Sequence, residues 1–171
     1  SFINAAGVTP LATFFILLSV VLFVLFMIPW TIKFFAYPAN IRKDLNHPVA
    51  ANFFPTMPIT LILFALNLKK YPTLFFSQEM SLQLGYYLWL IGTTGIYIMG
   101  FIILIHIFRH QEIKLQHANF GWYIPPVSKL LIPVSGYELA AHFPDRAEFI
   151  IAVSTASFGI GLFLFIFVGA A

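Results

Sequence analysis

The 171-residue chain is 60% hydrophobic and only 9% charged, and its mean hydropathy is +0.91. This composition excludes an ordinary soluble domain and predicts a protein that lies in a membrane. The formal net charge is +3, but the basic residues are scattered between apolar stretches, which argues against nucleic-acid binding. The absence of cysteine excludes disulfides, cysteine-ligated iron–sulfur clusters and thiol catalysis.

Five stretches are long or apolar enough to be transmembrane helices, which need about 20 mostly apolar residues. In chain order they lie within residues 11–35, 50–68, 84–108, 120–141 and 149–171. Prolines interrupt the second and the fourth stretch, whereas the third and fifth contain none and the first has Pro29 near its end. We therefore predict an all-α integral membrane protein with one transmembrane domain over residues 1–171.

The fourth predicted span places Pro125, Pro126, Pro133 and Lys129 in an otherwise apolar stretch. A proline inside a helix removes one hydrogen bond and pushes away the carbonyl four residues earlier. The freed carbonyls would be those of Gly121, Trp122 and Lys129. Because lipid cannot pair such groups, broken helices occur at membrane depth where protein or a water-filled cavity surrounds them.

This constraint predicts two layers of helices. The second and fourth spans would form an inner layer beside a path, and the first, third and fifth would face lipid. Small residues in the third and fifth spans would allow close helix contacts. These residues are Gly92, Gly95, Gly100, Gly159 and Gly161.

The positive-inside rule predicts the orientation of the spans, because Lys and Arg concentrate in cytoplasmic loops. The end of the first span and the loops after the first and third spans hold five basic residues, against three for the loops after the second and fourth. The five are Lys33, Arg42, Lys43, Arg109 and Lys114, and the three are Lys69, Lys70 and Arg146. This pattern favours a cytoplasmic location for the first pair of loops, in a multi-pass protein of the plasma (inner) membrane.

Lys129 has two interpretations. An intramembrane cation is a functional-site candidate, and its ammonium would attract anions in a narrow path of low dielectric constant. Alternatively, it is a snorkelling or paired lysine with Glu138 as its partner. On a straight helix these two residues point to roughly opposite faces, so that pairing requires a bend at Pro133.

The start of the second span contains a further group of candidates. His47 and Pro48 precede it, and His47 either caps the chain, which the sequence favours, or titrates near neutral pH. Asn52 and Thr56 are four residues apart and would share one helical face, either toward an anion or toward a neighbouring helix. Phe53 would form part of a hydrophobic constriction or of the lipid-facing surface.

Two motifs carry a resemblance to a known family. The run from Asp44 to Thr56, DLNHPVAANFFPT, resembles the signature between the second and third helices of the tellurite-resistance and C4-dicarboxylate transporter family. Plant slow anion channels belong to the same superfamily. The stretch WYIPPV from Trp122 to Val127, followed by IPVSG from Ile132 to Gly136, resembles the fifth helix of that family. The resemblance covers residues 37–171.

The resemblance implies an architecture and an activity. Family members have ten transmembrane helices in five hairpins, with the odd-numbered helices around a pore and the even-numbered ones outside. The five spans would then be helices two to six, and the chain would be a fragment of a larger ten-helix domain. The family implies a trimer that transports C4-dicarboxylates, sulfite, tellurite-related species or small inorganic anions. From the histidine pattern we predict no cofactor and no metal. The predicted pore-lining or anion-binding residues are Asn52, Phe53, Pro55, Thr56, Pro126, Lys129 and Pro133.

Two other functions stay open at this stage. One is a non-transporting membrane subunit of a larger complex, which polar residues facing helix contacts would favour. The other, less favoured, is a haem-binding redox subunit, for which His106 and His110 have a four-residue spacing, with His117 and His142 in later loops. No catalytic triad, phosphate-binding glycine loop or paired intramembrane carboxylate occurs in the sequence, so we predict no enzymatic activity.

Overall fold

The computed structural model describes residues 10–47, 49–109 and 120–170, and for residues 106–109 the backbone only. Every regular element in these ranges is helical. In chain order the elements are α1 (Pro10–Ala36), α2 (Pro38–Leu45), η1 (Ala50–Phe53), α3 (Thr56–Lys70), α4 (Gln78–Arg109), η3 (Phe120–Tyr123), α5 (Ile124–Ala140), η4 (Pro144–Arg146) and α6 (Ala147–Ala170). The prediction of an all-α membrane fold is confirmed.

Four helices in the described ranges are long and apolar enough to cross a membrane: α1, η1 with α3, α4, and η4 with α6. These correspond to the first, second, third and fifth predicted spans. The fourth predicted span corresponds to η3 and α5, and α5 itself has only 17 residues. A short helix of this kind depends more on its protein neighbours than on lipid.

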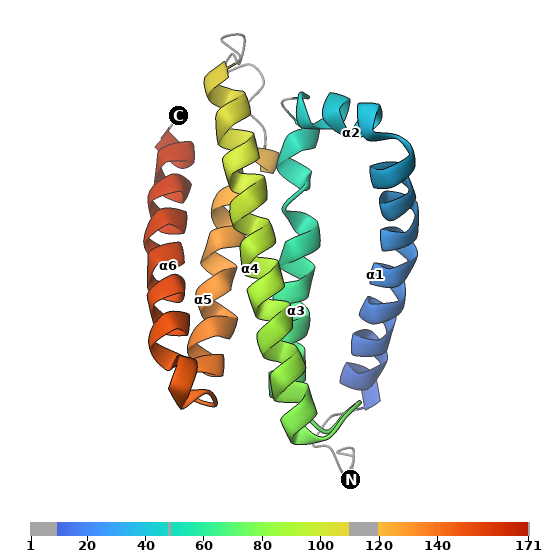
Figure 1. Cartoon of the computed structure of the whole chain (residues 1–171), viewed down its shortest axis with the longest axis vertical. Coiled ribbons are helices and arrows are strands. Elements are labelled where there is room, and N and C mark those ends of the chain that lie inside the picture. The colour runs from blue at the N-terminus through green and yellow to red at the C-terminus, as the bar shows by residue number, and fades with distance from the viewer. Residues whose placement is uncertain (1–9, 48, 110–119, 171) are drawn as a thin grey trace.

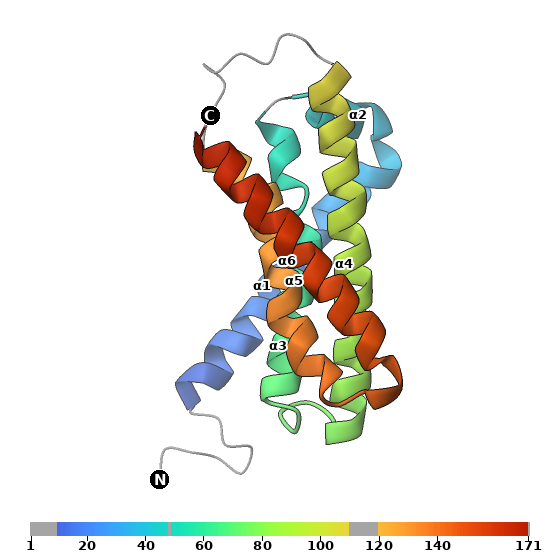
Figure 2. The same cartoon turned by 90° about the vertical axis from the view of Figure 1, so that its left-hand side faces the viewer.

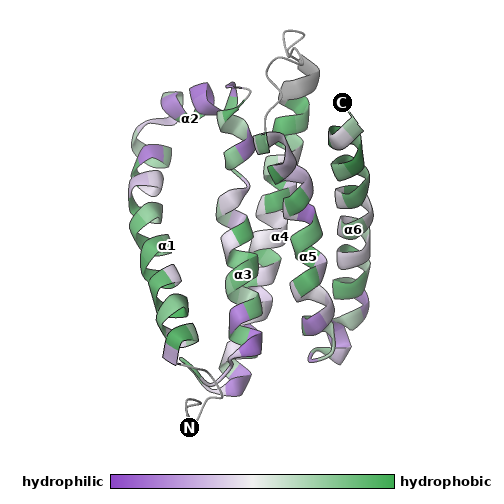
Figure 3. Ribbon diagram, turned by 180° about the vertical axis from the view of Figure 1, so that it is seen from behind, coloured by the Kyte–Doolittle hydropathy of each residue, from purple (hydrophilic) through white to green (hydrophobic). Residues whose placement is uncertain are grey.

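Helices α3 to α6 pack side by side, whereas α1 stands apart and α2 crosses one end of the molecule (Figure 1). The close pairs are α3 with α4 and α5 with α6, and α5 also contacts α3 and α4. Only 6% of the most apolar stretch of α1 is buried, and its residues are hydrophobic along most of the helix (Figure 3). A second view shows α1 inclined away from the other helices (Figure 2).

The helix α5 is the most enclosed element. Nine of its 17 residues are buried, compared with four of the 24 residues in α6. The helix with Lys129 and an internal proline is thus sheltered by three neighbours, as predicted for the inner layer. The prediction that α3 is an inner helix and α4 an outer one is less successful. In their most apolar stretches 28% of the residues are buried for Ala50–Lys70, against 33% for α4.

The prolines begin helices more often than they break them. Pro55 immediately precedes α3, and Pro125 and Pro126 occupy the first turn of α5. Proline suits a first turn because the amide hydrogen it lacks would have no partner there. Only Pro133 lies inside α5, so the expected helix breaks at Pro125 and Pro126 are wrong, and Gly121 and Trp122 belong to η3 before the helix.

Glycines on α4 and α6 let neighbouring helices approach closely. A Cβ atom at Gly92 would lie 2.9 Å from the carbonyl oxygen of Pro58, and one at Gly95 would lie 2.8 Å from the Pro58 side chain. Gly161 of α6 similarly faces Leu130 of α5 at 3.0 Å. The close-contact prediction is therefore confirmed for these glycines, but it is wrong for Gly159, which has no neighbour within 4 Å.

Candidate functional site

The two sequence motifs meet at one end of the bundle. The turn η1, which lies in the first motif, contacts both η3 and α5, which contain the second motif. Both α3 and α5 begin at this end, where α2 also lies (Figure 1). The amino termini of two helices, each with a partial positive charge, thus face the same side of the molecule.

His47 orders the chain that leads into this junction. Its Nδ1 accepts hydrogen bonds from the backbone N–H groups of Val49 and Ala50, each at 3.2 Å. The imidazole therefore caps η1, in agreement with the structural interpretation that the sequence favoured. Pro48, the other residue predicted at this mouth, lies outside the described residues.

Asn52 and Thr56 do not share one helical face. Asn52 is buried in η1, whereas Thr56 is exposed and begins α3 after an intervening turn. The four-residue spacing therefore fails as a predictor here, because no single α-helix spans both residues. The Thr56 hydroxyl donates to the carbonyl of Phe53 at 2.6 Å, and Phe53 itself is 50% exposed.

An open cavity of about 450 Å³ separates α1 from the first turns of α3. Thr56 and Thr60 contribute its polar atoms from α3, and Ser19 contributes from α1. These hydroxyls donate to carbonyls of their own chain segments, namely those of Phe53, Thr56 and Ile16. The remaining lining is apolar, so this cavity has no charged group that would select a ligand.

Lys129 is 4% exposed, and its ammonium lies between α5 and α4. The Nζ atom donates to the Pro125 carbonyl at 3.4 Å, at the long limit of a hydrogen bond. On its other side is Gly100 of α4, where a Cβ atom would lie 2.8 Å from Nζ. Pro126 and Pro133 are buried on the same helix.

The alternative interpretation, in which Lys129 pairs with Glu138, is wrong. Glu138 forms an ion pair with Lys69 of α3, with 2.9 Å between Nζ and Oε2. This contact joins the carboxyl-terminal ends of α3 and α5, far along α5 from Lys129. The angular argument from a straight helix was correct, because Pro133 does not bring these two side chains together.

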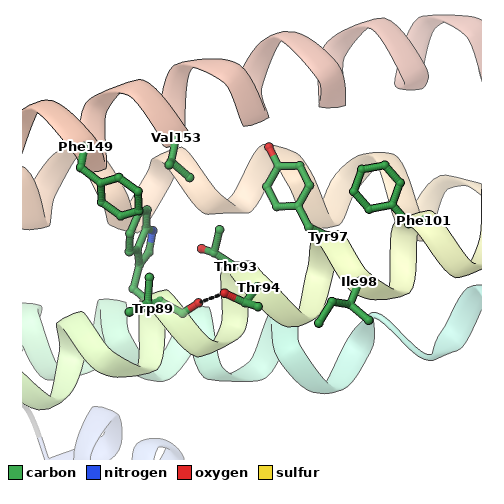
Figure 4. A pocket seen from close by; sticks show the side chains of 9 residues that line it. Trp89, Thr93, Thr94, Tyr97, Ile98, Phe101, Phe149 and Val153 are labelled. Atoms are coloured by element: carbon green, nitrogen blue, oxygen red, sulfur yellow. Dashed lines mark hydrogen bonds between the residues drawn. The ribbon is translucent and has the colours of Figure 1, made fainter.

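A second pocket, of about 300 Å³, lies between α4 and α6 (Figure 4). Trp89 and Phe149 line one end, and Tyr97 and Phe101 line the other. The Tyr97 hydroxyl is 2.9 Å from the hydroxyl of Ser157 on α6, so this polar pair connects the two helices. Thr93 and Thr94 also line the pocket, and its remaining walls are apolar.

No group of three or more His, Cys, Asp or Glu residues that could hold a metal occurs among the described side chains. His106, His110 and His117, on which the haem interpretation depended, lie outside them. His142 is exposed just after α5.

Sequence reasoning missed two contacts of this region. Gly100 was recognised as a close-contact glycine, but its partner, the Lys129 ammonium, could not be identified from spacing. Trp89 of α4 donates its indole N–H to the Ile132 carbonyl of α5 at 3.1 Å, and no motif marked this pair. Buried tryptophan normally finds an acceptor, which is the signal that could have suggested a partner.

Comparison with known proteins places the chain in a family. The profile of the family described as voltage-dependent anion channel (SLAC1) matches residues 2–171. Two uncharacterized transporters of Methanocaldococcus jannaschii are 30% and 29% identical to the chain over 149 residues, which is 86% of the chain in each case. The chain spans about two fifths of their length, since the matches cover 42% and 41% of them. No solved structure matches the chain. The match over nearly all its residues shows that the chain belongs to the voltage-dependent anion channel family.

Proposed function

We propose that this chain forms part of a membrane anion channel or transporter in which anions pass along α3 and α5. The family assignment supports transport in place of catalysis. The substrate classes that we propose are C4-dicarboxylates, sulfite, tellurite-related species and small inorganic anions. The assembly that we propose is a trimer in the plasma (inner) membrane, with the α2 end in the cytoplasm.

The observation that carries the proposal is the buried ammonium of Lys129. A cation in a helix at membrane depth is costly unless it interacts with an anion, a carbonyl or water. Its hydrogen bond to the Pro125 carbonyl is long, so an anion nearby would gain a strong electrostatic interaction. A compact ammonium acts on such an anion as a point charge.

The geometry of α3 and α5 supports a route toward this cation. Both helices start at the same end, so their dipoles favour anions arriving from that side. The residues that we propose to line or bind along the route are Asn52, Phe53, Pro55, Thr56, Pro126, Lys129 and Pro133. Amide and hydroxyl groups would replace part of the anion's hydration shell, and the apolar walls would restrict its flux.

Anion flux into proteoliposomes that contain the full-length gene product tests the proposal. Malate, sulfite, chloride and nitrate would be compared at the same concentration. We expect flux for at least one of them, and a decrease of at least about tenfold in Lys129→Met, because the substitution removes a unit charge from a poorly screened site. Lys70→Met is the matched control, because Lys70 is an exposed lysine at the opposite end of α3.

A non-transporting membrane subunit is the second candidate, and one observation favours it. Asn52, Ser128, Lys129 and Ser135 are all buried among the helices, where polar groups can serve helix association. Absence of flux for every anion, with the protein folded, would support this candidate and reject transport. Unchanged flux in Lys129→Met would reject the role of the lysine.

A further inference from the structure

We infer that Gly100 positions the Lys129 ammonium, and that the two residues together form a binding point for a small monovalent anion between α4 and α5. This inference rests on the proposed function, because it gives a residue-level basis to the anion interaction of Lys129. It adds a residue on α4, a helix from which the proposed route takes no side chain.

The Lys129 ammonium has more N–H donors than the described residues provide acceptors for. It carries three N–H groups, and the Pro125 carbonyl at 3.4 Å accepts from it. Of the acidic residues in α3 to α6, Glu138 pairs with Lys69, while Glu79 and Glu148 lie in the first turns of α4 and α6. None of these three is placed to neutralise Lys129. A buried cation that has no counter-charge among the described residues of α3 to α6 is a suitable site for an anionic ligand.

The surroundings favour a compact anion with a single charge. On α4, Ile96 and Ile103 lie one turn before and one turn after Gly100, and both are buried. A single ammonium between apolar side chains compensates one negative charge, whereas a dicarboxylate would bring a second charge without a partner. Chloride and nitrate therefore fit this position better than malate does.

Gly100 provides the room that the ammonium occupies. A Cβ atom at this position would lie 2.8 Å from Nζ and 3.6 Å from Cε of Lys129. Both atoms belong to the end of a flexible side chain, so Gly100→Ala would displace the ammonium without moving the helices. The neighbouring Gly92 differs, because a Cβ atom there would meet the Pro58 backbone at 2.9 Å.

The test compares glycine substitutions in two backgrounds. Chloride flux into proteoliposomes would be measured for the full-length protein as a function of chloride concentration. In Gly100→Ala we expect the half-saturating concentration to rise about fourfold, from the Coulomb energy of charges that move from about 4 to about 5 Å apart at an effective dielectric constant of about 20. Gly159→Ala is the matched control, because a Cβ atom there meets nothing within 4 Å.

The Lys129→Met background distinguishes an effect of Gly100 on the position of the ammonium from an effect on helix packing. In Lys129→Met, adding Gly100→Ala should change neither the half-saturating concentration nor the maximal flux. An additional change in that background would show that Gly100 acts through helix packing, and would overturn the inference. A Gly100→Ala protein with wild-type saturation, beside a defective Lys129→Met, would overturn the inference and leave the proposed function intact.

Folding is checked by the thermal unfolding midpoint in detergent, which Gly100→Ala should preserve. If that variant fails to fold, Gly100→Ser replaces it, because its hydroxyl can accept from the ammonium while still displacing it. We then expect a rise in the half-saturating concentration in Gly100→Ser but not in Gly159→Ser. Equal saturation in these two serine variants would overturn the inference.

Discussion

The indole N–H of Trp89 and the carbonyl oxygen of Ile132 form a hydrogen bond of 3.1 Å between α4 and α5, in a fully buried position. The same indole borders Gly136, where a Cβ atom would lie 3.1 Å from Nε1. The bond therefore holds the middle of α5 at a fixed distance from α4. Because hydrophobic burial contributes little between helices in lipid, such packing and hydrogen bonds determine how the helices associate.

We expect Trp89→Phe to lower the free energy of unfolding by about 1 kcal/mol, because it removes one buried hydrogen bond. The thermal unfolding midpoint in detergent micelles measures this loss. Trp30→Phe is the control, since Trp30 stacks on Phe34 of the sparsely buried helix α1. An equal decrease in both variants would contradict the importance of the bond to Ile132.

Gly136→Ala should destabilise the protein by about 1–3 kcal/mol, as overpacking of a tight interface does. The added methyl group would overlap the Ser154 hydroxyl of α6 and crowd the Trp89 indole. Thermal unfolding would be compared with Gly159→Ala, for which we expect no loss. Adding Ser154→Ala to Gly136→Ala should recover part of the midpoint, and no recovery would contradict this packing.

His47→Ala should lower the free energy of unfolding by about 1 kcal/mol, the usual loss for a removed helix cap. The reason is that the amide hydrogens of Val49 and Ala50 lose their Nδ1 acceptor. His47→Asn should retain most of the stability, because its side-chain oxygen can accept similar bonds. A variant with asparagine as unstable as the alanine variant would argue against capping.

A double-mutant cycle on Lys69→Gln and Glu138→Gln should give a coupling energy of about 0.2–1 kcal/mol, as for other partly exposed ion pairs. The side chains are 27% and 46% exposed, so solvent and salt weaken the attraction. We expect the coupling energy to decrease between low salt and 1 M salt, because the Debye length falls to about 3 Å at 1 M. A coupling independent of salt would contradict an electrostatic origin.

Several features of the fold followed from local sequence. The apolar stretches predicted the helices, because the hydropathy of a stretch and the need to pair every backbone group do not depend on distant contacts. The first and third predicted spans correspond to α1 and α4, and these two helices end on the same side of the bundle (Figure 1). The short helix α2 was not predicted, since its polar sequence has no apolar face long enough to mark it.

The prolines show where sequence reasoning failed. Their number in the fourth span indicated broken helices, but Pro125 and Pro126 instead occupy the first turn of α5. The effect of a proline depends on the residue at which its helix begins, and this boundary is set partly by tertiary contacts. The prediction that Asn52 and Thr56 share a helical face failed for the same reason, because α3 begins only at Thr56.

The sequence by itself determined that the protein is helical, lies in a membrane and carries the two motifs of its family, because composition and motif spacing are local properties. Only the tertiary structure decided that Lys129 meets Gly100, that Glu138 meets Lys69, and that Trp89 meets Ile132. These partners depend on the direction of each side chain around its helix and on the distance between helix axes. Both quantities are fixed by packing between segments far apart in the chain.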